Sequence, residues 1–104
     1  MTTREISGKQ LELDRDGHLT DASAWNEDIA RELAGEEGIA LTDRHWVVIN
    51  YMRKEHAATG VVPTVRKITK NSGVETKEMY ELFPKGPGKK AAKISGLPKP
   101  VGCV

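Results

Sequence analysis

The middle of the chain reads TDRHWVVINYMRKEHAATG (residues 42–60), and this stretch decides the fold because it predicts one long central helix. Thr42 is a good N-cap with Asp43 in the first turn, and Gly60 predicts the end of the helix. Apolar side chains cover much of its circumference: Trp46, Val47, Val48, Ile49, Tyr51 and Met52. A helix that is apolar on most sides is one that other elements surround.

Four more helices are expected around this central one. The first begins at Asp21 or Ser23 and places Trp25, Ile29 and Leu33 four residues apart, which predicts a stripe facing the core. The other three run from about Pro63-Thr64 to Asn71-Ser72-Gly73, over about residues 74–83, and from Pro87 through residues 89–94 to Gly96. Proline is favoured in the first turn of a helix, which supports the start of the last one.

The first twenty residues predict strands instead of helix. Apolar and polar residues alternate there, and Ser7-Gly8 and Asp16-Gly17 are turn signals. The aliphatic row that faces the core is expected to be Ile6, Leu11, Leu13 and Leu19. The interpretation is a mainly α single domain over residues 1–104. It comprises a hairpin (1–20), a bundle of about five helices (21–95) and a flexible C-terminal arm (96–104).

The composition is that of a small globular domain. The chain has 104 residues, of which 38% are hydrophobic and 30% charged, and its mean hydropathy is −0.51. No stretch approaches the ~20 apolar residues of a membrane span, and the N-terminus lacks the pattern of a signal peptide. The single cysteine fits a reducing, cytoplasmic setting. A domain of this size has no room for a large enclosed active site, so no stand-alone enzyme site is expected.

Charge is distributed unevenly along the chain. Residues 1–41 carry ten acidic and four basic side chains, whereas residues 42–104 carry five acidic and twelve basic ones. The last twenty residues hold five lysines and no acidic side chain. A basic C-terminal half predicts an acidic partner, either nucleic acid or a negatively charged protein surface, or otherwise a solvated lysine face that serves solubility.

Residues 63–83 have the outline of a helix-turn-helix, because a short glycine-containing turn separates two predicted helices. A DNA reader presents its second helix to the major groove, yet the outer positions here carry Glu75, Glu78 and Glu81 against Lys77. Two core helices joined by a tight turn are therefore the favoured interpretation. A helix-turn-helix DNA-binding regulator remains the alternative, and DNA is not the expected partner.

Neither a metal site nor a cofactor site is indicated. His18, His45 and His56 lack the i, i+4 spacing of a helical metal site, and no cysteine or carboxylate completes a ligand set. His45 lies in the first turn of the central helix, so a capping or packing role is expected. DRDG (14–17) lacks the further ligands of a calcium loop, and residues 85–90 lack the strand and hydroxyl residue of a phosphate loop.

Cys103 is the residue expected to carry the chemistry. It lies one position from the terminus, on LPKPVGCV (97–104), where two prolines and a glycine favour an extended, stiff segment. A terminal thiol on such a segment is a poor candidate for burial and a good one for presentation to a partner. Seven residues separate Gly96 from Cys103, a reach of up to about 23 Å. Oxidation of an exposed thiol would also permit a disulfide-linked dimer.

The arm and the lysines beside it are the expected contacts to that partner. Prolines stiffen the arm, glycines permit bends, Val104 supplies an apolar contact with the terminal carboxylate, and lysines guide the arm toward an acidic cleft. The predicted partner-binding residues are Lys89, Lys93, Gly96, Leu97, Pro98, Lys99, Pro100, Gly102 and Val104.

LFPKGPGKKAAKISGLPKPVGCV (82–104) resembles the C-terminal signature of the DsrC/TusE family of sulfur-relay proteins. Upstream pieces support the resemblance: DGHL (16–19), Trp25, LTDRHW (41–46) and the spacing Pro63…Arg66…Thr69-Lys70. The resemblance implies a small hairpin followed by an orthogonal helical bundle, with a helix-turn-helix-like element and a mobile C-terminal arm. The link over residues 70–79 is shorter than in many members of the family.

The resemblance also implies a function, sulfur carriage as a persulfide on the penultimate cysteine, here Cys103. Members that serve dissimilatory sulfite reductase have a second cysteine eleven residues earlier, where this chain has Ala92, so the pattern is similar to the single-cysteine TusE branch. The implied donor is a TusBCD- or DsrEFH-like protein. The implied acceptor is a thiouridylase-like enzyme of tRNA 2-thiouridine synthesis or a sulfite reductase-like enzyme of sulfur oxidation or reduction. A non-catalytic partner subunit of dissimilatory sulfite reductase is the alternative.

Overall fold

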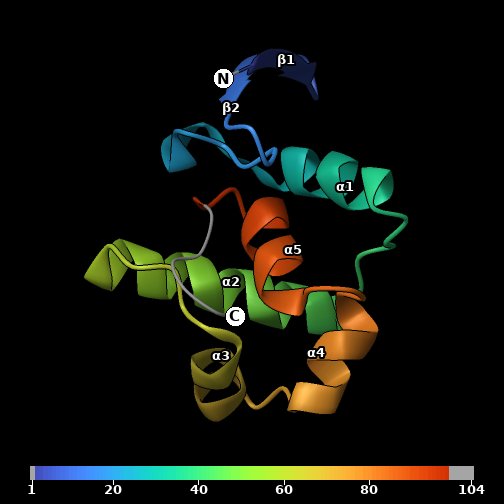
Figure 1. Ribbon diagram of the computed structural model, residues 1–104, viewed down its shortest axis with the longest axis vertical. Coiled ribbons are helices and arrows are strands. Elements are labelled where there is room, and N and C mark those ends of the chain that lie inside the picture. The colour runs from blue at the N-terminus through green and yellow to red at the C-terminus, as the bar shows by residue number, and fades with distance from the viewer. Residues whose placement is uncertain (1, 99–104) are drawn as a thin grey trace.

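The computed structural model describes residues 2–98, which form a hairpin and a bundle of helices (Figure 1). The elements in chain order are β1 (Thr2–Ile6), β2 (Lys9–Leu13), the 3₁₀ turn η1 (Ala22–Ala24), α1 (Glu27–Glu36), α2 (Asp43–Thr59), α3 (Val65–Ser72), α4 (Thr76–Leu82) and α5 (Pro87–Ile94). The predicted fold class, mainly α with an N-terminal hairpin and five helices, is confirmed for these residues. The flexible arm predicted for the end of the chain lies mostly outside them.

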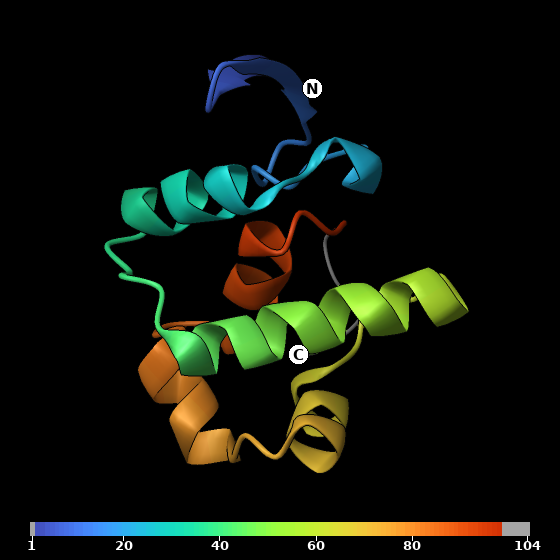
Figure 2. The same ribbon diagram turned by 180° about the vertical axis from the view of Figure 1, so that it is seen from behind.

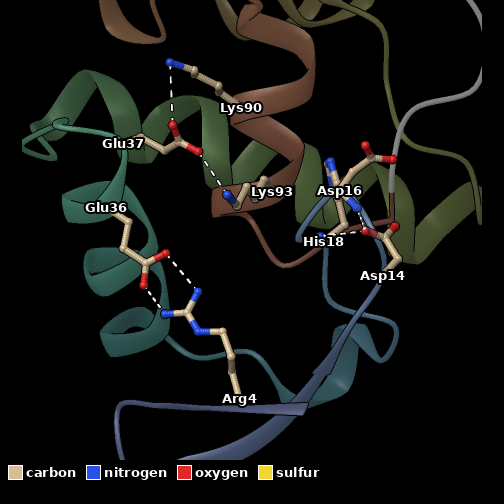
Figure 3. Close-up of polar contacts among 8 residues, drawn as sticks. All are labelled: Arg4, Asp14, Asp16, His18, Glu36, Glu37, Lys90 and Lys93. Carbon is tan, nitrogen blue, oxygen red and sulfur yellow. Dashed lines mark hydrogen bonds and ion pairs between the residues drawn. The ribbon is translucent and has the colours of Figure 1, made fainter. Parts of the chain in front are cut away.

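β1 and β2 pair as an antiparallel hairpin through a two-residue turn. Ser7 and Gly8 both have positive φ, of 52° and 80°, as a type I′ turn requires. The row of aliphatic residues predicted to face the core is buried: Ile6, Leu11, Leu13 and Leu19. The hairpin is also joined to α1, since Arg4 pairs with Glu36 (Figure 3).

α1 begins later than its apolar spacing predicts. Asp21 caps the separate turn η1, where its carboxylate accepts from the backbone N–H of Ser23 at 3.0 Å. Trp25 is then extended (φ −74°, ψ 148°), and Asn26 caps α1 by accepting from the backbone N–H of Ile29 at 2.9 Å. Two local caps therefore divide what reads as one helix, although Ile29 is buried as expected.

α5, and not α2 alone, occupies the centre of the bundle. Both ribbon views show α5 between α1 and α2, and it contacts α1, α2 and α4 (Figures 1 and 2). Its buried side includes small residues, Gly88, Ala91 and Ala92, which let neighbouring helices approach closely. α2 has the predicted bounds between Thr42 and Gly60, but Val47 is 37% exposed, so one side of α2 is open to solvent.

α3 and α4 form the predicted helix-turn-helix outline below α2 (Figure 1). Gly73 ends α3 with φ +81°, and α4 starts at Thr76 rather than 74 because Val74 turns into the core instead of opening a helix. Ile68 and Met79 anchor the two helices and are fully buried. Within residues 2–98, no helix has the length and apolar character needed to cross a membrane.

Candidate functional site at the end of α5

The predicted site lies partly within the described residues. Lys89, Lys93, Gly96, Leu97 and Pro98 can be placed. The remaining predicted residues, Lys99, Pro100, Gly102, Cys103 and Val104, lie outside the described part of the chain. The structure therefore describes the end of α5 and the residues up to Pro98, together with the side chains that surround them.

α5 ends in a Schellman motif. Gly96 has φ +73°, a conformation that favours glycine, and its N–H donates to the carbonyl of Lys93 at 3.1 Å. The N–H of Leu97 donates to the carbonyl of Ala92 at 3.0 Å. These two bonds turn the chain sharply away from the helix axis at Gly96.

Gly96 and Leu97 belong to the folded domain, which corrects their prediction as partner contacts on the arm. Both are buried, and Leu97 is only 1% exposed. A Cβ atom at Gly96 would overlap the side chain of Trp25, so the glycine is needed for close packing as well as for its positive φ. Pro98 is the first exposed residue after the end of α5.

Three side chains from distant elements bond the carbonyls at this turn. Trp25 Nε1 donates to the carbonyl of Ile94 at 2.8 Å, and Arg53 Nη1 donates to that of Ser95 at 2.7 Å. His18 Nδ1 lies 3.2 Å from the carbonyl of Leu97. We call Trp25, Arg53 and His18 the exit clamp.

The members of the exit clamp also contact one another and the rest of the domain. The Arg53 guanidinium lies 4.1 Å from the ring centroid of Trp25, a cation–π contact. Its Nη2 donates to the carbonyl of Ala22 at 3.1 Å, which links η1 to the end of α5. Burial lowers the pKa of Arg53, but a guanidinium stays protonated at any physiological pH.

His18 donates a hydrogen bond to the end of α5. A carbonyl can only accept, so the Nδ1 that faces Leu97 carries a proton. Burial is the main cause that lowers the pKa of His18, and Lys93 adds to it, while the bond to Leu97 and the charges of Asp14 and Asp16 act in the opposite direction. The backbone N–H of His18 donates to Asp14 Oδ1 at 2.9 Å, which fixes the loop that carries the ring (Figure 3).

A lysine-rich hollow of about 200 Å³ lies beside the exit clamp. Its lining is formed by four lysines and three other polar residues: Lys85, Lys89, Lys90, Lys93, Asp16, His18 and Glu37. Lys93 Nζ bonds Glu37 Oε1 at 2.9 Å, and Lys90 Nζ is 3.7 Å from Glu37 Oε2 (Figure 3). The hydrogen bond from Lys93 lowers the pKa of Glu37. Lys89 is exposed, so the hollow presents positive charge to solvent.

Other predicted features have structural roles. His45 Nδ1 accepts from the backbone N–H of Thr42 at 3.0 Å, and its Nε2 bonds the carbonyl of Leu82 at 2.8 Å, which confirms the capping role. In residues 2–98, no group of three or more histidine and acidic side chains is arranged to hold a metal ion. Glu78 on α4 pairs with Arg44 at 2.7 Å. The helix that would enter the DNA groove therefore presents an acidic face, part of which is engaged in this ion pair.

The exit clamp was missed by the sequence analysis, although one signal was present. Arg53 follows Ile49 by four residues and Met52 by one, so it lies on the side of α2 that faces the core. An arginine at such a position needs buried acceptors, and that need predicts a polar cluster. Trp25 was assigned to the core stripe, and His18 was considered only as a metal ligand, although both are among the residues that carry the family resemblance.

Comparison with known proteins gives a consistent picture. A family model described as "DsrC like protein" matches residues 5–104. A relative named Sulfurtransferase TusE, from Pectobacterium atrosepticum, is 41% identical over 107 residues, covering 96% of this chain and 98% of that protein. A relative named sulfite reductase, dissimilatory-type subunit gamma, from Nitratidesulfovibrio vulgaris, is 42% identical over 98 residues, covering 93% of each.

Solved structures have the same fold. The oxidized gamma subunit of dissimilatory sulfite reductase (DsrC) from Archaeoglobus fulgidus superimposes with a TM-score of 0.87 at 40% identity, covering 99% of this chain and 100% of that one. DsrC from Allochromatium vinosum gives a TM-score of 0.85 at 37% identity and covers 98% and 97% of the two chains. These proteins are similar to this chain along nearly its whole length.

Proposed function

The chain belongs to the DsrC-like protein family, and on this premise we propose that it is a sulfur-relay carrier that accepts sulfane sulfur as a persulfide on Cys103. The sulfur-relay role agrees with relatives named as a sulfurtransferase and as a subunit of sulfite reductase. This chain's own residues support the finer assignment of the thiol and of its partners.

The transfer step balances without an external oxidant or reductant. The Cys103 thiol releases its proton, and the thiolate attacks the outer sulfur of a donor persulfide. The donor's S–S bond breaks as a new S–S bond forms to Sγ of Cys103, and the donor thiolate leaves and takes up a proton. Repetition of the same exchange, with an acceptor's cysteine thiolate as the attacking group, discharges the carrier.

One observation carries the proposal: the chain has a single cysteine, and it lies six residues beyond the point where the backbone is anchored at Leu97. Since six residues reach at most about 20 Å, a thiol at this place is tethered within reach of a partner's cleft. The exposed position of Pro98 supports a segment that continues away from the core.

The absence of a second cysteine favours the TusE-like role over the two-thiol role. Ala92, where two-cysteine members have their other thiol, is fully buried on α5. Because Cys103 is the only cysteine, an internal disulfide cannot form in this chain. A carrier that exchanges one persulfide at a time needs no second thiol.

The lysine-rich hollow supports partners with acidic surfaces. Of the two lysines predicted to contact a partner, Lys89 is exposed and Lys93 is half-buried in its pair with Glu37. Lys89 is therefore the more available of the two for a contact. We assign the donor to the TusBCD- or DsrEFH-like class and the acceptor to the thiouridylase-like or sulfite reductase-like class. A cytoplasmic setting would keep the thiol reduced between transfers.

The experiment that tests the carrier role is a pulse and chase of ³⁵S. A donor loaded with labelled persulfide is mixed with the protein, and the label is then chased to a thiouridylase-like acceptor. We expect label on the wild-type chain first and on the acceptor afterwards, with none on Cys103→Ser. Label that reaches the acceptor equally fast with Cys103→Ser would overturn the proposal.

A second candidate function, a non-catalytic partner subunit of sulfite reductase, is favoured by the 42% identity to the gamma subunit from Nitratidesulfovibrio vulgaris. In that case the thiol serves docking and not transfer. Co-purification of Cys103→Ser with a sulfite reductase whose activity is undiminished would support this function and exclude the carrier role in that complex.

A further inference from the structure

We infer that Trp25, Arg53 and His18 are positioning residues for sulfur transfer, because they fix the direction in which the segment that carries the thiol leaves the fold. This inference rests on the proposed function and adds residues to it that sequence reasoning did not assign. Each of the three side chains donates a hydrogen bond to a backbone carbonyl at the end of α5. They act through the backbone of residues 94–97.

The three donors converge from separate parts of the chain on four consecutive residues. His18 follows the hairpin, Trp25 precedes α1, and Arg53 is on α2. Each uses a side-chain N–H to bond one carbonyl: 3.2 Å to Leu97, 2.8 Å to Ile94 and 2.7 Å to Ser95. The turn at Gly96 is thereby tied to three other parts of the chain.

The end of α1 shows which hydrogen bonds are sufficient to cap a helix in this protein, and it can be compared with the end of α5. α1 ends in the same Schellman motif, in which the N–H of Gly38 bonds the carbonyl of Gly35 at 3.1 Å and that of Ile39 bonds Ala34 at 2.8 Å. Among the hydrogen bonds of residues 2–98, no side chain donates to the carbonyls of residues 36–39. Backbone hydrogen bonds alone are therefore sufficient to end a helix in this protein. The three side-chain hydrogen bonds of the exit clamp are not needed for that purpose.

Direction at the exit matters because the segment beyond it is long. Leu97 and Cys103 are separated by at most about 20 Å, so tilting the exit by about 10° displaces the far end by up to about 3.5 Å. Transfer between two sulfur atoms requires an approach to roughly 3–3.5 Å in the right alignment. A loosened exit would therefore spread the thiol over many unproductive positions relative to a protein partner. A small freely diffusing persulfide would not sense the change.

This difference between large and small donors defines the experiment. Trp25→Phe keeps an aromatic side chain but removes the N–H, and Arg53→Lys keeps the charge but cannot bridge Ser95 and Ala22. Both variants are compared with Ile68→Val, a buried residue on α3 outside the clamp, at a temperature well below all three melting points. Persulfide formation is followed with a loaded TusBCD-type donor and, separately, with glutathione persulfide.

We expect kcat/KM with the protein donor to fall about five- to tenfold in both clamp variants, and rates with glutathione persulfide to stay within about twofold of wild type. Ile68→Val should match wild type with both donors.

Clamp variants that match wild type with the protein donor, or that are slowed no more than Ile68→Val, would overturn the inference while leaving the carrier role intact. A wild-type chain that forms no persulfide with either donor would instead contradict the proposed function. If Trp25→Phe fails to fold, the transfer rates of Arg53→Lys alone test the inference.

Discussion

The end of α5 and the α3–α4 pair are both short helical regions, but different forces hold them. At the end of α5, side chains from distant elements bond the carbonyls of Ile94, Ser95 and Leu97. The α3–α4 pair is anchored by buried apolar side chains such as Ile68 and Met79, and its polar groups form exposed ion pairs.

The difference indicates where the molecule needs one defined backbone geometry. Apolar packing tolerates small shifts, whereas long-range hydrogen bonds to buried carbonyls specify position and are costly to lose. The domain places such bonds at the end of α5, on the carbonyls of Ile94, Ser95 and Leu97. The helix-turn-helix outline, which is typical of DNA-binding proteins, is here a way to close the core.

The largest expected effect is at Gly96. Gly96→Ala adds a Cβ that overlaps Trp25, at a φ of +73°, so we expect a loss of about 3 kcal/mol or more in the free energy of unfolding. Gly60→Ala is the matched control, because Gly60 has a similar φ of +76° with open space around it, and should cost about 1 kcal/mol. Urea denaturation of both variants measures the difference, and equal costs would contradict the close packing at the exit.

A smaller effect is expected from pH through His18. Its pKa is lowered in the folded state, so the neutral ring contributes stability above its ordinary value of 6.5, and this stability is lost as the pH falls below 6.5 toward the folded pKa. His18→Asn keeps a donor for Leu97 and cannot titrate. Between about pH 7.5 and pH 5.5, the wild-type chain should lose more unfolding free energy than His18→Asn. Parallel curves would show that the buried ring does not titrate as described.

Charge reversal on α3 should have little effect. Arg66 and Lys70 line a surface hollow of about 350 Å³, and Lys67 is left unchanged because it pairs with Glu55. Arg66→Glu with Lys70→Glu should change stability by no more than about 0.5 kcal/mol and leave persulfide formation within about twofold. Salt-sensitive duplex DNA binding by the wild type that this variant abolishes would favour the regulator over the carrier.

The smallest effect on stability is expected at the terminus. Deletion of Cys103 and Val104 should leave the melting temperature nearly unchanged, because these residues lie beyond the anchored Leu97. The same deletion should abolish sulfur acceptance. A drop of several kcal/mol in calorimetry, on the scale of a lost core side chain, would place the tip in the core instead.

Much of the fold was predictable because local signals agreed with the packing. Thr42 and Gly60 bound α2 as expected, and Ile6 and Leu19 are buried as the alternation indicated. The start of α1 was not predictable from apolar spacing, since the cap at Asn26 overrides it.

Spacing indicates the core-facing position of Arg53 on α2, but it does not indicate the partners in the exit clamp. His18 and Leu97 are 79 residues apart, and only the tertiary fold joins them. The central place of α5 was missed for a related reason. Its small residues, such as Ala91 and Ala92, give a weak hydrophobic signal, although they permit the closest approach of its neighbours.

The most direct test of the central claim is mass spectrometry of the tryptic peptide of residues 94–104 after reaction with a persulfide-loaded donor. This peptide follows Lys93, and its internal Lys99-Pro100 bond resists trypsin, so Cys103 stays within one fragment. We predict a gain of about 32 Da, one sulfur atom, that disappears on reduction and is absent from Cys103→Ser. An unmodified peptide from wild-type protein, or the same gain on Cys103→Ser, would contradict the account.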